Sequence, residues 1–199
     1  MCIRDSKCII QNSSSTGLAC FGTTVNATNC LIYASGMFNV YCNLGGTYNF
    51  SNCTFDNSFN SSTSPVASVQ VGNQLYKNVD SIPTPLNLFA GFRNCIINGA
   101  LDDEVALLHY NNGNAFNTVF YHNLIKAKKI TFDNTNIINQ DPKFKTPFTG
   151  DFHLDSLSPA IDHGVTYPPI PVPDDLDDVI RKLARANDTI PDIGSYEFK

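Results

Sequence analysis

The chain has 199 residues, of which 42% are hydrophobic and 16% are charged, and its formal net charge is −5. This balance excludes an intrinsically disordered chain, which combines low hydrophobicity with high net charge, and it excludes the strongly basic surface of a nucleic-acid-binding protein. No apolar run reaches the roughly 18 residues of a membrane-spanning helix, so the sequence predicts no transmembrane segment.

The first six residues read Met-Cys-Ile-Arg-Asp-Ser. They resemble a short leader found on many unrelated gene predictions from environmental sequence assemblies, where adapter sequence has been translated. We therefore expect residues 1–6 to be a non-native leader and the chain to be a fragment of a longer protein. The alternative is an ordinary polar N-terminal segment.

From residue 7 a repeat of about 22 residues organises the sequence. Its anchors begin at positions 7, 29, 52, 73, 94 and 117, so the steps between them are 22, 23, 21, 21 and 23 residues. In four anchors the second residue is a cysteine and the residue two later is apolar, which is the period of a strand with one face in a core. We predict that these cysteines form one inward-facing row: Cys8, Cys30, Cys53 and Cys95.

A second row of small or apolar residues lies 12 residues after the second anchor position. It comprises Cys20, Cys42, Pro65 with Val66, Leu86, Leu107 and Ile130. Asparagines that follow the anchors by five residues, at Asn12, Asn57 and Asn78, predict corners of the repeat. Asn tolerates the left-handed conformation that a sharp corner needs.

Inward rows, stacked corners and the lack of a sustained 3.6-residue period predict an all-β, parallel β-helix solenoid. Each coil of about 22 residues would hold three short strands and advance by about 4.8 Å, so that six coils give a rod of about 29 Å. Stacked cysteines at that spacing strain disulfide geometry, which favours reduced thiols. The alternative is disulfide pairing of the six cysteines other than Cys2. No CxxC or HxxxH spacing indicates zinc.

Beyond about residue 136 the repeat gives way to short blocks. They read Asp-Pro-Lys-Phe at 141–144, Gly-Asp-Phe-His-Leu at 150–154, Ser-Pro-Ala-Ile-Asp-His-Gly at 158–164 and Pro-Asp-Ile-Gly-Ser-Tyr-Glu-Phe at 191–198. This series resembles the C-terminal signature of bacterial proteins of the pectin-lyase-like superfamily, particularly the choice-of-anchor Q group. Residues 94–126 also resemble the last coils of such surface proteins from Bacteroidetes-type bacteria. The resemblance implies a right-handed parallel β-helix of about six coils with a C-terminal capping segment, located outside the cell or on its surface.

We therefore divide the chain into a leader at 1–6, coils at 7–135 and a C-terminal cap at 136–199. The open end of a solenoid needs covering, and we expect six apolar side chains of the cap to plug it: Phe144, Phe148, Phe152, Leu154, Leu157 and Ile161. Prolines 168, 169, 171 and 173 predict an extended strap. A short helix is predicted from Asp174 or Asp175 to Ala186. Asp178 stands where the family pattern has a turn-forming glycine.

The sharpest candidate site is the acidic run Asp102, Asp103 and Glu104, with His109 nearby. Carboxylate oxygens are ligands that Ca²⁺ takes, so the run predicts calcium as the one possible cofactor. The resemblance adds that glycosidases of this superfamily use clustered aspartates. A lyase would need an Arg or Lys base close to bound metal, for which Arg93 and the group from Lys126 to Lys129 are available. The alternative is a solvated turn without a ligand.

Other polar residues carry weaker signals. The four histidines, His109, His122, His153 and His163, show no ligand spacing, and we expect them to be surface or packing residues. The glycosylation sequons that begin at Asn12 and Asn26 are expected to carry no sugar, since they lie at repeat corners of a bacterial protein.

The expected function is that of a secreted or cell-surface module, monomeric, which serves as a structural or carbohydrate-contacting scaffold with polysaccharide as its partner. The alternative is a polysaccharide lyase or glycoside hydrolase. Flat outward rows of Asn, Ser and Thr would favour the scaffold, whereas carboxylates that converge with Arg or Lys in a groove would favour the enzyme.

Overall fold

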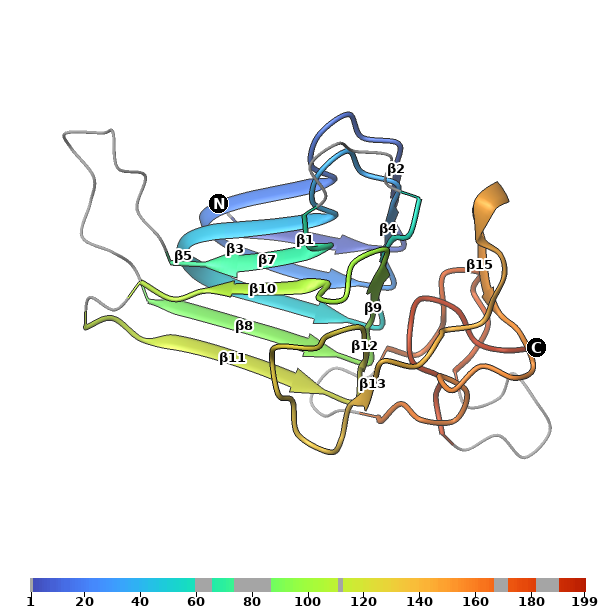
Figure 1. Cartoon of the computed structure of the whole chain (residues 1–199). Helices are drawn as coiled ribbons and strands as arrows, with labels where there is room; N and C mark the ends of the chain where they lie inside the picture. Colours follow the sequence, from blue (N-terminus) through green and yellow to red (C-terminus); the bar gives the residue numbers. More distant parts are fainter. Residues whose placement is uncertain (1, 60–65, 74–86, 111–112, 167–171, 182–189) are drawn as a thin grey trace.

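The computed structural model describes residues 2–59, 66–73, 87–110, 113–166, 172–181 and 190–199, and these residues contain strands but no α-helix (Figure 1). A large parallel sheet contains β1 (Cys2–Ser6), β3 (Leu18–Thr28), β5 (Val40–Ser51), β7 (Val69–Gly72), β8 (Leu88–Arg93), β10 (Val105–Leu108) and β11 (Phe116–Tyr121). A narrow parallel sheet contains β2 (Ile9–Gln11), β4 (Leu31–Tyr33), β6 (Thr54–Asn57), β9 (Ile96–Gly99), β12 (Leu124–Ile125) and β13 (Ile137–Ile138). A hairpin joins β14 (Phe144–Thr146) to β15 (Asp151–Leu154) through the 3-10 turn η1 (Pro147–Thr149).

The strand register tests the predicted repeat. In the narrow sheet Ile9 lies beside Leu31 and Leu31 beside Thr54, which reproduces the first two steps of 22 and 23 residues. Thr54 then pairs directly with Ile96, so the anchor predicted at residue 73 is wrong. Likewise Ile96 pairs with Leu124, and the segment anchored at 117 belongs to β11 of the large sheet instead.

The reason lies in the large sheet, where β7 and β8 pair with two consecutive stretches of β5. The chain between Cys53 and Cys95 therefore makes a single passage through both sheets, with residues 73–87 connecting β7 to β8. Two apparent steps of 21 residues were thus one longer level of the stack. Sequence spacing alone does not distinguish these cases, because an inserted connection has no required composition.

In the narrow sheet a left-handed corner lies two residues before each of β2, β4, β6, β9 and β12. Four of these corners are the first residue of a predicted anchor. A column of five such residues has φ between 50° and 56°: Lys7, Asn29, Asn52, Asn94 and His122. Asn12, with φ 55°, confirms one predicted corner, whereas Asn57 lies within β6 and Asn78 lies outside the described residues. Asn is favoured at these corners because it adopts the left-handed conformation at low cost.

Ala34 follows β4 and has φ 53°. Its methyl side chain cannot form the local hydrogen bonds by which Asn and Asp compensate for the left-handed conformation. We expect Ala34→Gly to stabilise the protein by about 0.5–1 kcal/mol, because Gly removes the left-handed strain while costing some entropy in the unfolded chain. Urea unfolding would measure the change. The matched control is Ala27→Gly in the buried part of β3, which should destabilise; a loss of stability at Ala34 as well would contradict the strain argument.

The main core lies between the two sheets. The register places Cys8, Cys30, Cys53 and Cys95 in one column, and all four pack in this core, so the predicted inward row is confirmed. None of the six described cysteines, which exclude Cys2, forms a disulfide. The second row holds Cys20, Cys42, Val71 and Leu107, with Val71 in place of the predicted Pro65 and Val66; Pro65 and the predicted Leu86 lie outside the described residues.

Three phenylalanines form a stack through the core. Phe50, Phe92 and Phe120 occupy one register column, and their ring centroids are 5.0 Å and 4.9 Å apart with nearly parallel planes. Phe50 and Phe92 are fully buried. Aromatic contacts of this kind add to the free energy of burial, so the stack joins three adjacent levels of the large sheet.

The C-terminal segment covers the outer face of the narrow sheet (Figure 1). Ile96 and Leu124 pack against Leu154, while Leu31 packs against Phe152 in a separate cluster. The predicted plug is therefore wrong: these side chains cover a flank of the stack, and Phe148 and Leu157 are 85% and 79% exposed. Alternation explains the difference, because neighbouring strand residues face opposite sides and leave apolar groups outside as well as inside.

The helix expected from residue 174 is also not formed in residues 174–181. Asp174 instead pairs with Ile180 in an antiparallel bridge, and residues 182–186 lie outside the described residues, as do prolines 168, 169 and 171. The Asp175 carboxylate accepts hydrogen bonds from the backbone of Asp177 and Val179, which closes a turn instead of starting a helix. Asp178 has φ 64°, the left-handed conformation that suits the glycine of the family pattern.

A buried polar lock fastens this turn to the sheets. Arg181 donates to the Glu197 carboxylate, to the Asn29 side chain at 2.8 Å and to the Gly194 carbonyl at 2.9 Å. Arg181 and Glu197 are 5% and 1% exposed, and the second Glu197 oxygen has no hydrogen-bond partner among the described residues. Burial raises the pKa of Glu197 to about 7, against the opposing effect of Arg181.

This raised pKa predicts a pH-dependent stability. An acid that binds its proton more tightly when folded stabilises the protein below its unfolded pKa, and this contribution is lost as the pH rises through the folded value. Between pH 4.5 and about 7 we expect the free energy of unfolding to fall by up to about 3 kcal/mol from this group. Urea unfolding across this range should show the slope in the wild type and lose it in Glu197→Gln; an equal slope in both proteins would contradict the assignment.

Candidate binding pocket

The three carboxylates of the acidic run, Asp102, Asp103 and Glu104, each have hydrogen-bond or ion-pair partners in the structure. The Asp102 side chain is 74% exposed and pairs with Lys128 at 3.2 Å. Asp103 accepts hydrogen bonds from the backbone of Lys128 and Lys129, both at 2.7 Å. Glu104 is 1% exposed and accepts from the backbone of Ser68 and Leu101.

The pKa values of Asp103 and Glu104 are shifted in opposite directions. Donation from Lys129 and Lys128 holds the pKa of Asp103 below its usual range, whereas burial raises the pKa of Glu104. Asp102 and Asp103 thus both contact the Lys128–Lys129 segment, whereas Glu104 contacts the backbone of Ser68 and Leu101. In the described ranges no three His, Cys, Asp or Glu side chains gather in a group that could hold a metal ion.

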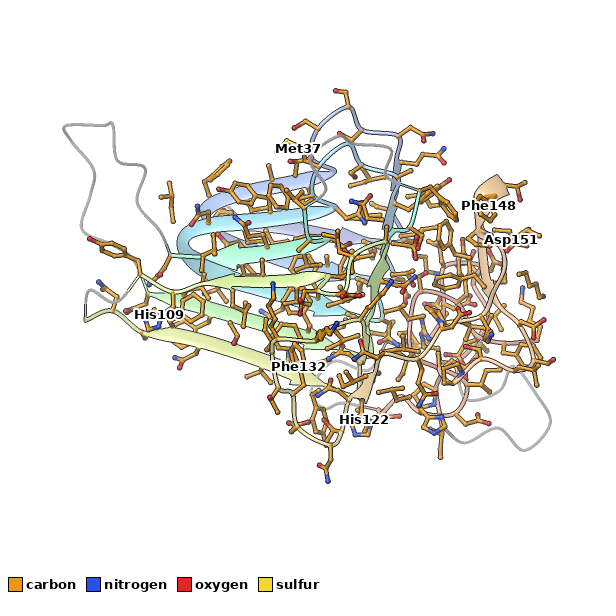
Figure 2. The ribbon with its side chains drawn as sticks, in the orientation of Figure 1. Met37, His109, His122, Phe132, Phe148 and Asp151 are labelled. Atoms are coloured by element: carbon orange, nitrogen blue, oxygen red, sulfur yellow. The ribbon has the colours of Figure 1, made fainter. Side chains whose placement is uncertain are left out.

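The histidines do not gather in one group. His122 contacts the His163 carbonyl, whereas His109 stacks on Phe116 at another place in the molecule (Figure 2). His153 is different because both of its ring nitrogens lie near carboxylates, at 2.5 Å from Asp151 and 2.8 Å from Asp177. Sequence reasoning gave His153 no role, because Asp177 lies 24 residues away and only the fold brings it there.

A pocket of about 480 Å³ opens between the ends of β6 and β9 and the hairpin of residues 144–154, hereafter the pocket hairpin. The hairpin contributes mainly apolar and basic groups, and the sheet side contributes polar ones. The lining residues used below are Asp56, Asn98, Asp141, Lys143, Lys145 and Phe148. Convergent polar groups beside an aromatic wall are typical of small-molecule sites.

Asp56 forms the floor of the pocket at the end of β6. It is 1% exposed, and its carboxylate accepts from Asn98 at 2.7 Å and from the backbone and hydroxyl of Ser58 at 2.9 and 3.1 Å. Burial nevertheless raises its pKa, although these bonds and Lys126 act in the opposite direction. Asp56 and Asn98 are neighbours in the register, so the narrow sheet itself positions the floor.

Asp141 and Lys143 form the rim. The Asp141 carboxylate accepts from the Lys143 backbone at 2.9 Å and pairs with its ammonium at 3.2 Å. The Lys143 backbone donor is the main reason that the pKa of Asp141 is lowered. Two carboxyl groups of one pocket are therefore shifted in opposite directions.

An exposed aromatic side chain completes the pocket wall. Phe148 projects from η1 (Figure 2), with 85% of its surface exposed. The centroid of its ring lies 4.2 Å from that of the Phe59 ring. A ring held against a second ring yet open to solvent offers a flat apolar face to a ligand. From the sequence, Phe148 was expected in a core plug. Its position in the loop between two short strands is the feature that indicates an exposed side chain instead.

The outer face of the large sheet presents polar rows. Thr24 lies beside Thr47 and Asn26 beside Asn49, with a hydrogen bond of 3.0 Å between the two asparagine side chains. These residues are partly exposed, while Val25 and Ala27 between them are buried. Such rows are the outward pattern that favours a scaffold.

Within the described residues no helix is long and apolar enough to span a membrane. Comparisons with protein-family models, with curated proteins and with solved structures find no match to this chain.

Proposed function

We propose that the chain is part of a right-handed parallel β-helix, secreted or displayed on the cell surface, of the kind its C-terminal blocks resemble. The 22- and 23-residue steps between paired strands and the inward cysteine column support a solenoid path. The buried polar lock gives the last block a structural role, because Glu197 belongs to this block and holds Arg181, which in turn donates to Asn29.

The function that this geometry supports best is contact with a polysaccharide through the pocket. The observation that carries the proposal is the exposed Phe148 ring above a polar floor made by Asp56 and Asn98. A sugar ring has an apolar face and a rim of hydroxyls, so it fits an aromatic wall combined with carboxylate and amide groups.

The test is binding of fluorescently labelled cellohexaose, mannohexaose and hexagalacturonate, measured by anisotropy. We expect at least one to bind and Phe148→Ala to weaken that binding about three- to tenfold, the usual contribution of an aromatic contact. Leu157→Ala is the matched control, because Leu157 is equally exposed but does not line the pocket. Equal losses in both variants, or no binding by any of the three, would refute the proposal.

A second candidate is glycoside hydrolysis. The opposite pKa shifts of Asp56 and Asp141 favour it, because glycosidases use one protonated carboxyl as acid and one carboxylate as base or nucleophile. The discriminating assay follows reducing ends and unsaturated-product absorbance with acidic and neutral polysaccharides. Reducing ends that disappear in both Asp56→Asn and Asp141→Asn would establish the hydrolase; unsaturated products would indicate a lyase; binding without either leaves the scaffold.

A further inference from the structure

A histidine that lies between two carboxylates fastens the pocket hairpin. His153 lies on β15, and its Nδ1 is 2.5 Å from Asp151 and its Nε2 is 2.8 Å from Asp177. Asp151 belongs to the hairpin, whereas Asp177 belongs to the turn that Asp175 and Arg181 fasten to the rest of the fold. The imidazole therefore bridges the hairpin to a fixed support.

The bridge is complete only when the imidazole is protonated. Neutral imidazole has a single N–H and donates one hydrogen bond, whereas the imidazolium donates from both nitrogens. Deprotonation leaves one nitrogen lone pair facing a carboxylate, which repels it. His153 is 28% exposed, so it can exchange its proton with solvent.

Both carboxylates of the bridge keep their negative charge more readily than usual. Burial acts to raise the pKa values of Asp151 and Asp177, but donation from His153, with Lys199 acting on Asp177, holds both below the usual range. Among the described residues, the other ionisable groups around the bridge are Lys145, whose charge acts on Asp151, and Asp175 and Tyr33, which lie near Tyr196. The Tyr196 ring packs on the imidazole at 4.1 Å between centroids, and burial raises its pKa to about 12, so Tyr196 stays neutral.

We propose that protonation of His153 fixes the pocket hairpin and so sets the shape of the pocket according to pH. Asp151 pairs with Thr146 across the hairpin, and Thr146, Pro147 and Phe148 form the pocket wall. Loss of one carboxylate contact on deprotonation loosens this wall. The consequence for ligand affinity rests on the proposed function; the movement of the hairpin does not.

The absence of tryptophan from the sequence provides a direct test. Phe148→Trp makes a single fluorescent reporter at the pocket wall, far from His109 in the molecule (Figure 2). Histidine ordinarily changes its charge between about pH 5 and 8. Across this range we expect the emission maximum and acrylamide quenching of the reporter to follow one titration curve. The curve should vanish when His153→Gln is added and persist when His109→Gln is added.

Two further measurements test the bridge: the response of the reporter in an Asp177→Asn variant, and the affinity for a ligand at two pH values. Asp177→Asn keeps the histidine but removes one carboxylate, so it should also flatten the curve; circular dichroism checks that each variant is folded. The proposal is overturned if the parent reporter does not titrate or if it titrates equally in His153→Gln. With the labelled hexasaccharide that binds best, affinity should fall about fivefold from pH 5.5 to pH 8. If none binds at either pH, the proposed function fails while the reporter still decides the bridge.

Discussion

Arg181→Met should lower the free energy of unfolding by about 3–5 kcal/mol, because it leaves Glu197 buried without its cation and Asn29 without its donor. Met fills similar space along the chain but supplies none of the hydrogen bonds. Arg181→Lys should recover only a minor part of the loss, because an ammonium cannot reproduce the planar arrangement that reaches Glu197, Asn29 and Gly194 together. Urea unfolding measures each value.

Lys128→Met is the matched control for the loss of a cation. Lys128 pairs with Asp102, but the two side chains are 72% and 74% exposed. Exposed ion pairs contribute about 0–1 kcal/mol, so this variant should differ little from the wild type. If the free energy of unfolding of Arg181→Met also differed from that of the wild type by only about 0–1 kcal/mol, the polar lock would not hold the C-terminal segment in solution.

Phe92→Ala should cost about 3–5 kcal/mol, since it removes the central ring of the stack formed with Phe50 and Phe120 and leaves a cavity. Phe89→Ala is the control on the same strand: it makes the same chemical change where the side chain is 47% exposed on the opposite face. We expect its effect to remain below about 1 kcal/mol. Thermal or urea unfolding compares the two.

The difference between the two variants tests the register of β8 independently of any absolute value. A shift by one residue would exchange the inner and outer faces and reverse the order of the two losses. Equal losses would mean that residue 89 is buried in solution, against a partner that covers the sheet face.

The parts of the fold that depend on local residue patterns could be predicted from the sequence. Alternation around Cys30 and Cys53 predicted a buried strand face, and the register supports it. The spacing of the anchors predicted the stacked levels only where each strand of a level is uninterrupted. The prediction failed after Cys53, where β7 and β8 together take the place of one continuous strand. Composition carries no signal for the length of such a connection.

The candidate site was not predictable in the same way. Adjacent carboxylates in the sequence favoured Asp102 and Asp103, both of which contact Lys128 in the structure. The pocket instead combines Asp56 with residues more than 80 positions later, such as Asp141 and Phe148. Only tertiary packing of the C-terminal segment on the narrow sheet brings them together, and no periodic pattern records that contact.

The reach of the C-terminal segment has a consequence for how this chain folds. Lys7 forms ion pairs with Asp174 and Asp178, 167 and 171 positions away, and Gly194 donates to the Asn94 carbonyl. Repeat stacks normally have short sequence separations, fold from any point and fray from their ends. Here Lys7 and Asn94 complete these contacts only when residues 174, 178 and 194 pack against the strands, which raises the contact order and slows this closing step. The strands and the C-terminal segment should therefore unfold together as one cooperative unit and should not fray level by level.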